Sequence, residues 1–299
     1  MYTDSKHNRG SMLVLVLFLA GLLAVFAAVA ATAMQASVNV SRNFADSIRA
    51  EESFRAAIEL TMAQSGQQIA ALRGTNTIVL DRVQVAITVT NEASRIDLNV
   101  APAELIAGLF RQVGVADNQA DAYAARVLDW RDEDDQTEKK GGAERGAYRS
   151  LGRVDGPRNG PFVHPSELAL VLGIPAAVAA AVAPYVTVAS GQEQINPLLA
   201  DPPVLLALPG TTANSVRDFL RRRADPTAAF ESLIPSLGRV EQFVTSENGV
   251  AVRFEGDVRV GTNYQRRFEA VVYVSEGDNE PFRILSWDAN PSARVRTLQ

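Results

Sequence analysis

The chain has 299 residues, of which 47% are apolar and 21% charged, a balance typical of folded domains rather than of disordered chains. It contains no cysteine, which excludes disulfide frameworks, thiolate nucleophiles and thiolate metal sites. The formal net charge of −5 argues against a broad electrostatic attraction to nucleic acid or anionic lipid.

The N-terminal region contains an uncharged, apolar run from Met12 to Met34. At about 1.5 Å per residue, a helix of this length crosses a hydrocarbon core of about 30 Å. Lys6 and Arg9 precede the run, and a short basic flank is retained on the cytoplasmic side. The sequence therefore predicts a single-pass inner-membrane helix with the rest of the chain in the periplasm.

A secretory signal peptide is the alternative, because Ala31-Thr32-Ala33 resembles a small-residue cleavage site. The apolar run exceeds the roughly 7–15 residues usual in such signals, but length alone leaves both alternatives open. The junction Arg9-Gly10-Ser11 favours a retained helix. It resembles the type III signal of pilins and pseudopilins, which implies that a prepilin peptidase cuts between Gly10 and Ser11 and leaves the helix attached.

Leu15 is the fifth residue when Ser11 is counted as the first, and major pilins carry Glu at this position. The resemblance implies that this Glu neutralises the terminal amine of a neighbouring subunit, since an unpaired charge in a helical bundle is costly. A subunit at the tip has no neighbour ahead of it, and a missing Glu is typical of K-type tip pseudopilins. Ser11 replaces the commoner Phe, which is a second departure from the pilin pattern.

The apolar helix is predicted to continue beyond the membrane as an amphipathic helix and to end at Gly66. Apolar residues recur at four-residue spacing while charged residues occupy the other faces. The recurring residues are Val40, Phe44, Ile48, Phe54, Ile58 and Met62.

The rest of the sequence predicts a sheet that is interrupted by helices. Residues 77–90 are rich in β-branched residues and are predicted to form one strand. Alanine-rich and leucine-rich runs broken by Gly and Pro follow, and strand character then returns. The expected helices are 103–113, 116–131, 165–172 and 213–223, and the closing strands are 250–260, 266–274 and 282–287. The predicted fold class is α+β, with a long helix on a small antiparallel sheet and a large all-α insertion.

Three motifs resemble those of the general secretion pathway protein K family, the K-type minor pseudopilins of bacterial type II secretion. They are Ile96-Asp97-Leu98-Asn99-Val100-Ala101-Pro102, similar to I-N-L-N-T-A-P; Leu128-Asp129-Trp130-Arg131-Asp132 with Gly142-Ala143-Glu144 and Tyr148; and Pro161-Phe162 with Ser166-Glu167-Leu168. A degraded copy of the first motif begins at Ile195-Asn196, where Pro197 and Leu198 depart from the pattern.

The family resemblance implies a structural subunit rather than an enzyme, one that initiates and caps a short periplasmic pseudopilus. Its implied divisions are a leader over 1–10, the pilin helix over 11–66, the first strands over 67–95, the helical insertion over 96–237 and the closing strands over 238–299. Its implied partners are the I-type and J-type minor pseudopilins, the prepilin peptidase and the inner-membrane assembly platform.

Asp129, Asp132, Asp134 and Glu144 belong to an acidic stretch that we consider as a calcium site, because calcium binds carboxylate oxygens converging from a flexible loop. The spacing does not fit an EF-hand, since Thr137 stands where the sharp-turn Gly belongs when counting from Asp132. From the residues alone, a solvated acidic loop is the simpler interpretation. The family resemblance implies calcium in pseudopilins of this kind, so both interpretations stay open.

Leu206-Ala207-Leu208-Pro209-Gly210 resembles the hairpin of helix-hairpin-helix modules, in which amides at a helix N-terminus hold a phosphate. The alternative function is therefore a membrane-anchored DNA-binding receptor. A turn between packed helices with a solvated basic end is the simpler interpretation, so nucleic-acid binding is not expected. The basic residues that follow the hairpin are Arg217, Arg221, Arg222 and Arg223.

No catalytic residue is assigned. The chain has two histidines, His7 in the leader and His164 beside a proline, which cannot supply a histidine-based relay or metal site. The sequence also lacks the G-x-S-x-G, H-E-x-x-H, Walker and G-x-G-x-x-G motifs.

Overall fold

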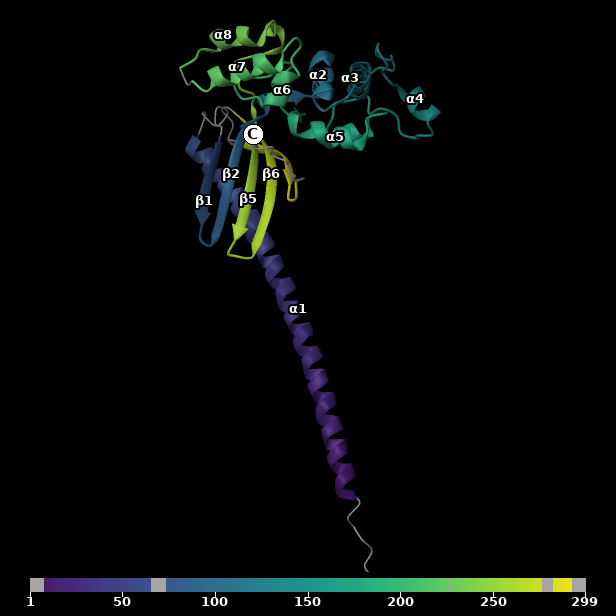
Figure 1. Ribbon diagram of the computed structural model, residues 1–299, viewed down its shortest axis with the longest axis vertical. Coiled ribbons are helices and arrows are strands. Elements are labelled where there is room, and N and C mark those ends of the chain that lie inside the picture. Colours follow the sequence, from purple (N-terminus) through teal and green to yellow (C-terminus); the bar gives the residue numbers. More distant parts are fainter. Residues whose placement is uncertain (1–7, 66–73, 226, 276–281, 292–299) are drawn as a thin grey trace, which may run out of the picture.

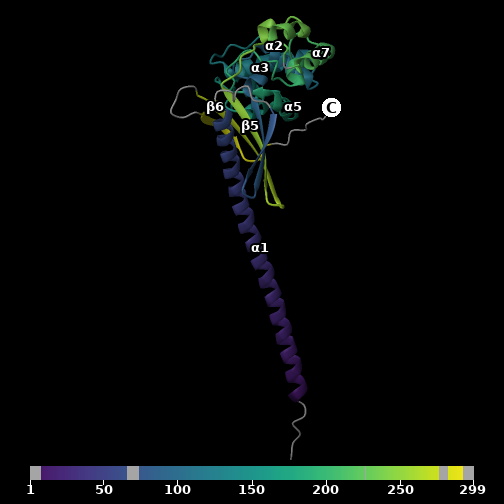
Figure 2. The ribbon, with the colours of Figure 1, turned by 90° about the vertical axis from the view of Figure 1, so that its left-hand side faces the viewer.

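The fold was determined from a computed structural model, which describes residues 8–65, 74–225, 227–275 and 282–291. A single helix, α1 (Asn8–Ser65), forms a long stalk whose C-terminal part packs on a sheet, and a helical domain lies on the sheet's far end (Figures 1 and 2). Among the described residues, α1 is the one helix long and apolar enough to cross a membrane. Residues 1–7 of the predicted leader and Gly66, the predicted end of the helix, lie outside the described residues.

Five antiparallel strands form the sheet, in the order β1-β2-β5-β6-β7. The central pair joins segments on either side of the helical domain, with Asn91 of β2 opposite Val252 of β5. The predicted α+β fold class is confirmed. The strands are β1 (Gly74–Leu80), β2 (Val83–Asn91), β5 (Ala251–Val260), β6 (Tyr264–Val274) and β7 (Phe282–Asp288).

The single strand predicted over 77–90 is wrong, because the chain reverses at Asp81 and Arg82 to form a hairpin of β1 and β2. Asp81 has a φ of 52°, and Asp is one of the few residues that adopt this left-handed conformation readily. A two-residue hairpin loop needs this conformation. The flanking β-branched residues concealed the turn, since they share one composition on both sides of it.

The C-terminal part of α1 covers one face of the sheet through an aromatic cluster. The Phe54 ring stacks on Phe268 at 5.4 Å between centroids and lies 5.3 Å from the Trp287 ring. Gly256 on β5 lies directly under Phe54, and a Cβ at this position would be 2.3 Å from the ring carbons. The close approach of helix and sheet therefore requires a residue without a side chain at position 256.

The helical domain has a separate apolar core, which extends as far as Val244 and contains the fully buried Leu105, Phe110 and Phe219. The helix predicted over 165–172 is a shorter 3-10 helix, Pro165–Leu170, whose start is capped by His164 and Glu167. The helices are η2 (Glu92–Ser94), α2 (Ala103–Gln112), α3 (Asp117–Arg131), α4 (Arg145–Ser150), η3 (Pro165–Leu170), α5 (Ala176–Val182), η4 (Ala183–Tyr185), α6 (Pro202–Leu206), α7 (Ala213–Arg223), α8 (Phe230–Leu233), η5 (Ile234–Leu237) and η6 (Glu241–Phe243), with a parallel pair of β3 (Ile96–Asp97) and β4 (Val186–Thr187).

A buried ion-pair network joins the helical domain to the sheet. The carboxylate of Glu92, fully buried, accepts hydrogen bonds from Arg95 at 2.9 Å and from Arg253 of β5 at 2.8 and 2.9 Å. The hydroxyl of Thr187 donates to the same carboxylate, and Arg253 also pairs with Glu269. Every charged group in this network has an oppositely charged partner beside it. The groups can therefore be buried at the junction of the two domains without an unpaired charge.

Candidate functional site

The membrane-facing part of α1 carries the first group of predicted site residues. Gly10 and Ser11 lie in the first turns of the helix, and Leu15 follows with 57% of its surface exposed. From Met12 to Met34, every described side chain is exposed, so the protein itself covers none of this apolar surface. Lipid or helices of other subunits must therefore cover it.

The apolar positions that follow the membrane run are of two kinds. Phe54, Ile58 and Met62 are buried against the sheet, as expected for an amphipathic helix on a domain. Phe44 and Ile48, which precede them along α1, are exposed. The predicted stripe thus serves as core in its C-terminal half and as uncovered apolar surface in its N-terminal half.

Three of the four predicted acidic ligands meet between α3 and α4. Asp129 lies in the last turn of α3, Asp132 caps its C-terminus, and Glu144 precedes α4. Each offers a carboxylate oxygen within 4.8 Å of the other two. Asp134 is not in the group, because its Oδ1 accepts a hydrogen bond from Gln136 N in a local turn. The cluster is therefore Asp129, Asp132 and Glu144.

The chain folds tightly around this acidic cluster. Asp129 accepts backbone hydrogen bonds from Glu138 N and Ala143 N. Gly142 sits beside it, and a Cβ at that position would be 2.2 Å from Asp129 Oδ2. The Gly142-Ala143-Glu144 motif is thus explained by packing: the glycine lets the loop close over Asp129 and brings Glu144 to the cluster. Sequence reasoning missed Asn159, whose Nδ2 donates to Asp134 O at 3.1 Å and holds the acidic loop.

Electrostatics makes this cluster unusual. Burial and the neighbouring Asp129 and Asp132 carboxylates raise the pKa of Glu144 to about 7. Burial and nearby carboxylates also raise the pKa values of Asp129 and Asp132. Both oxygens of Glu144, which is 7% exposed, and Oδ1 of Asp132 have no hydrogen-bond partner among the described residues. Buried, unpartnered carboxylate oxygens that converge on one point fit a hard cation such as calcium.

The first and third family motifs hold loops of the helical domain together. Asn99 donates through Nδ2 to Phe162 O at 3.0 Å and accepts at Oδ1 from Phe162 N at 2.7 Å, which joins the first and third motifs. In the first motif, Asp97 Oδ1 accepts from Asn99 N. In the degraded copy, Asn196 Oδ1 accepts from Leu198 N at 3.0 Å, so the same turn forms despite the altered residues.

Polar groups of the hairpin after α6 bond other groups of the helical domain. The Thr211 hydroxyl donates to Leu208 O at 2.8 Å, and Gln112 Nε2 donates to Leu206 O at 3.1 Å. At the start of α7, the side chains of Thr212 and Ser215 accept from each other's backbone N–H. This capping box occupies two of the amides that an anion at the helix N-terminus would need.

The basic residues around the hairpin already have partners. Arg217 donates to Asn214, Arg221 pairs with Asp218, Arg222 donates to Ser232 O, and Arg223 donates to Pro197 O and Ala200 O. They act as caps and braces within the helical domain.

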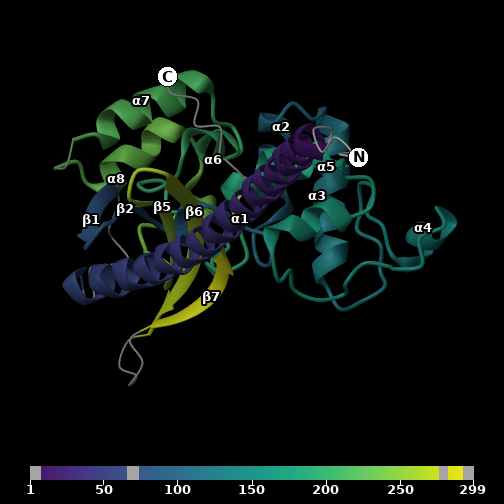
Figure 3. The same ribbon diagram turned by 90° about the horizontal axis from the view of Figure 1, so that it is seen from below.

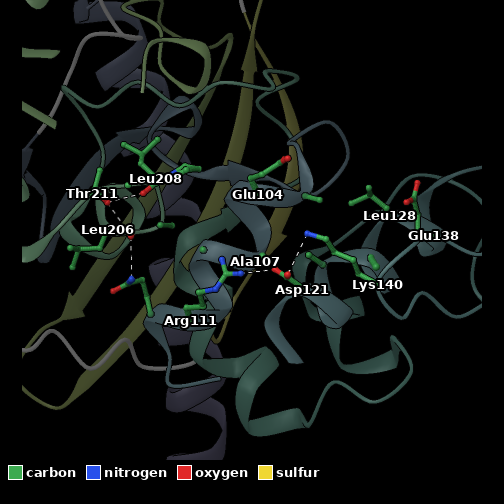
Figure 4. Close-up of a pocket in the computed structure, with 18 of the residues that line it drawn as sticks. Glu104, Ala107, Arg111, Asp121, Leu128, Glu138, Lys140, Leu206, Leu208 and Thr211 are labelled. Atoms are coloured by element: carbon green, nitrogen blue, oxygen red, sulfur yellow. Dashed lines mark hydrogen bonds and ion pairs between the residues drawn. The ribbon is translucent and has the colours of Figure 1, made fainter. Parts of the chain in front are cut away.

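A cavity of about 560 Å³ lies next to the hairpin, and Arg111 and Lys140, which line it, form ion pairs with aspartates (Figure 4). Arg111 pairs there with Asp117 at 2.9 Å and with Asp121 at 2.5 Å, and Lys140 lies 3.4 Å from Asp121. The charged side chains point toward one another across the cavity (Figure 4). The geometry therefore does not favour the DNA-receptor alternative.

His164, one of the two histidines of the chain, caps a short helix. His164 Nδ1 accepts a hydrogen bond from Ser166 N at 3.1 Å and caps η3, while its backbone N–H donates to Glu167. Its position at the start of a 3-10 helix accounts for the residue without any catalytic role.

The fold defines the class of protein first: a long apolar N-terminal helix packed on an antiparallel sheet is the pilin-like arrangement of a membrane-anchored subunit. Residues 64–191 match the family model described as type II secretion system (T2SS), protein K. The resemblance to the type II secretion protein K family that the sequence motifs predict is thereby confirmed over residues 64–191.

Comparison with solved structures agrees on the fold. The chain is similar to one in the crystal structure of the GspK-GspI-GspJ complex from the type 2 secretion system of enterotoxigenic Escherichia coli. The TM-score is 0.61 at 20% sequence identity, over 87% of this chain and 99% of that chain. No curated protein sequence gives a significant match.

Proposed function

We propose that this pseudopilin is the tip subunit of a periplasmic pseudopilus, where it initiates assembly and caps the fibre during protein export. The observation that carries the proposal is Leu15, an apolar residue where a subunit inside the fibre needs a carboxylate to pair with its neighbour's terminal amine. The subunit acts by binding and not by catalysis.

The position of the helical domain supports the capping role. This domain lies beyond the end of the sheet farthest from the exposed part of α1 and extends well past the sheet on the side of α4 (Figure 1). A subunit added above would have to overlap this volume. A bulky head on a pilin helix therefore allows subunits below it and blocks those above it.

The partners follow from the same role. The similar structure is a complex of GspK with GspI and GspJ, and we infer that I-type and J-type minor pseudopilins bind this chain. The exposed apolar surface of α1, including Phe44 and Ile48, is the surface that supports helix packing with them. The prepilin peptidase is expected to cut between Gly10 and Ser11 on the cytoplasmic face, and the inner-membrane assembly platform to receive the processed helix.

We also propose that the acidic cluster of Asp129, Asp132 and Glu144 binds calcium as a structural ion. The unpartnered oxygens and the raised pKa of Glu144 support this, because a divalent cation would stabilise three carboxylates that otherwise repel one another. The ion would fix the end of α3 against the start of α4.

The tip role is tested by comparing Leu15→Glu with the wild type and with Leu17→Glu, a matched control two residues deeper in the membrane. If nothing lies above Leu15, the new carboxylate lacks a partner and costs about 2.5–3.5 kcal/mol on insertion into hydrocarbon. Both variants should then lower secretion and co-purification with the I-type and J-type partners. Stronger assembly in Leu15→Glu alone, with the protein found along the fibre, would refute the tip assignment.

A further inference from the structure

The segment formed by α4 and the turn that follows it, residues 145–154, protrudes from the helical domain; we refer to it as the α4 loop. It lies at the outer margin of that domain, away from the sheet and from α1 (Figures 1 and 3). Its interactions with the rest of the chain are confined to its base, so its outer surface faces solvent.

The α4 loop carries unusually exposed apolar side chains. Leu151 is 69% exposed and Val154 is 92% exposed. Among the described residues after α1, seven large apolar side chains are exposed, and Val154 is the most exposed of these. Leu151 and Val154 lie three positions apart in one short loop, so the loop presents both of them to solvent.

The same loop is strongly basic. Arg145, Arg149 and Arg153 lie within it, and positions 145–154 contain no acidic residue, although the whole chain has a net charge of −5. No carboxylate in the described part of the chain forms an ion pair with these three arginines. The Arg153 guanidinium instead lies over the Tyr148 ring, 5.1 Å from its centroid.

The base of the loop is fixed. Tyr148 is fully buried, and its hydroxyl accepts a hydrogen bond from Leu172 N at 2.9 Å. The turn is closed by Arg153 N, which donates to Tyr148 O at 3.1 Å, and by Gly152 with a φ of 74°. A binding surface that is ordered before it meets its partner loses little conformational entropy on binding.

We propose that the α4 loop is a docking surface for a protein partner that presents carboxylates around an apolar depression. Arginine is enriched at protein interfaces and their hot spots, and the arginines of the loop form no ion pair within the described part of the chain that would compete with a partner's carboxylates. The charge of the loop selects an acidic partner by complementarity. The site is distinct from the α1 surface assigned to the other pseudopilins, so the inference goes beyond the proposed function.

Two other classes of ligand fit the loop less well. A nucleic acid needs basic groups that follow its backbone, whereas here the exposed aliphatic residues Leu151 and Val154 stand beside Arg153 along the chain. A lipid surface is disfavoured because the loop belongs to the head, at the opposite end of the molecule from the apolar run of α1 (Figure 1).

Photo-crosslinking of the full-length chain in membranes of its native host tests the proposal. A benzophenone amino acid replaces Val154, and the same residue at Val79, which is 67% exposed on β1, is the control. We expect Val154 to yield one discrete crosslinked protein whose linked segment is rich in Asp and Glu. Arg149→Glu should lower the yield about tenfold, Arg149→Lys should retain it, and reversing the partner's acidic residues should restore it in Arg149→Glu.

The proposal is overturned by the absence of a Val154-specific crosslink, by the same partner from Val79, by a linked segment without acidic residues, or by a yield that Arg149→Glu leaves unchanged. The thermal unfolding of Arg149→Glu is measured alongside, and an unchanged midpoint shows that the effect is not one of folding. Co-purification with the I-type and J-type partners should be unaffected, which separates failure of this surface from failure of the assembly role.

Discussion

Glu92 is a fully buried carboxylate whose charge is stabilised by arginines rather than by water. Burial raises the pKa of Glu92, but the charges of Arg253 and Arg95 outweigh this effect and lower it to about 2, from an ordinary value of 4.5. As the pH falls, the unfolded chain therefore binds the proton first. The stabilisation from Glu92 should be complete above pH 4.5 and should be lost progressively between there and pH 2.

Replacing Glu92 by Gln tests this junction. The change leaves two buried guanidinium groups without their main partner, and we expect it to lower the free energy of unfolding by about 3–5 kcal/mol. Denaturant unfolding of the full-length protein in detergent micelles measures this, and the variant should lose the pH dependence below 4.5. The exposed Asp257–Arg267 pair provides the control, since Asp257→Asn should cost less than about 1 kcal/mol. Equal, small losses in both variants would contradict this account of the junction.

Gly256→Ala tests the docking of α1 on the sheet. The new Cβ would lie 2.3 Å from the Phe54 ring, so the ring must move out of its stack with Phe268. We expect a loss of about 1–3 kcal/mol in the free energy of unfolding. Gly146→Ala is the matched control, because its Cβ meets no atom within 4 Å and should change stability by less than about 1 kcal/mol. Similar stability in both variants would show that the close approach at Gly256 is not required.

Calcium binding has a definite pH signature. Without the ion, the raised pKa of Glu144, about 7, means that the folded state holds a proton that the unfolded state releases near 4.5. The stability of the calcium-free head should therefore fall as the pH rises from 4.5 to 7. Calcium should reverse this loss at pH 8, and its affinity should decrease as the pH falls below 7, because protons compete for Glu144.

Thermal unfolding with calcium and with a chelator measures the effect. Calcium at about 100 times its dissociation constant should raise the midpoint by roughly 5–10 °C at pH 8. Glu144→Gln should abolish that rise without lowering the midpoint of the calcium-free protein, since the amide removes a repelling charge. Glu133→Gln in the same loop is exposed and should keep the rise. An undiminished calcium effect in Glu144→Gln would exclude the site.

At the scale of elements, regular periodicity predicts the long helix, one helix of the head and the closing strands. The four-residue spacing in α1, the closing strands and the helix from Ala213 to Arg223 all follow from local patterns. The hairpin at Asp81 was missed because Asp-Arg is not a common two-residue turn and its flanks are uniform. Local patterns also cannot predict the ion pair between Glu92 and Arg253, since the two residues are 161 positions apart in the sequence.

The acidic site shows the same limit. Composition pointed to Asp129, Asp132, Asp134 and Glu144, and the structure brings three of them together. The sequence alone does not distinguish Asp134 from the other three. Whether a carboxylate faces the cluster or accepts a hydrogen bond within its own turn depends on the geometry of the loop. Gly142 was visible as part of a family motif, but its reason, the close passage of the chain over Asp129, is visible only in three dimensions.

The three parts of the molecule follow one another along its long axis. The apolar part of α1 is left uncovered, the sheet fixes the upper part of that helix, and the helical domain adds a broad head on the far side (Figure 1). This order suits a subunit that is anchored at one end and blocks addition at the other. It requires that the apolar helix remain part of the mature protein.

Mass spectrometry of the N-terminus of the membrane-extracted protein tests that requirement most directly. A tip pseudopilin should begin at Ser11 and retain the apolar run through Met34, and replacing Gly10 by a bulkier residue should leave the leader uncut while the head still folds. A mature protein that begins near Gln35 would be a released signal-peptide substrate without an anchor, and that result would contradict the tip-subunit account.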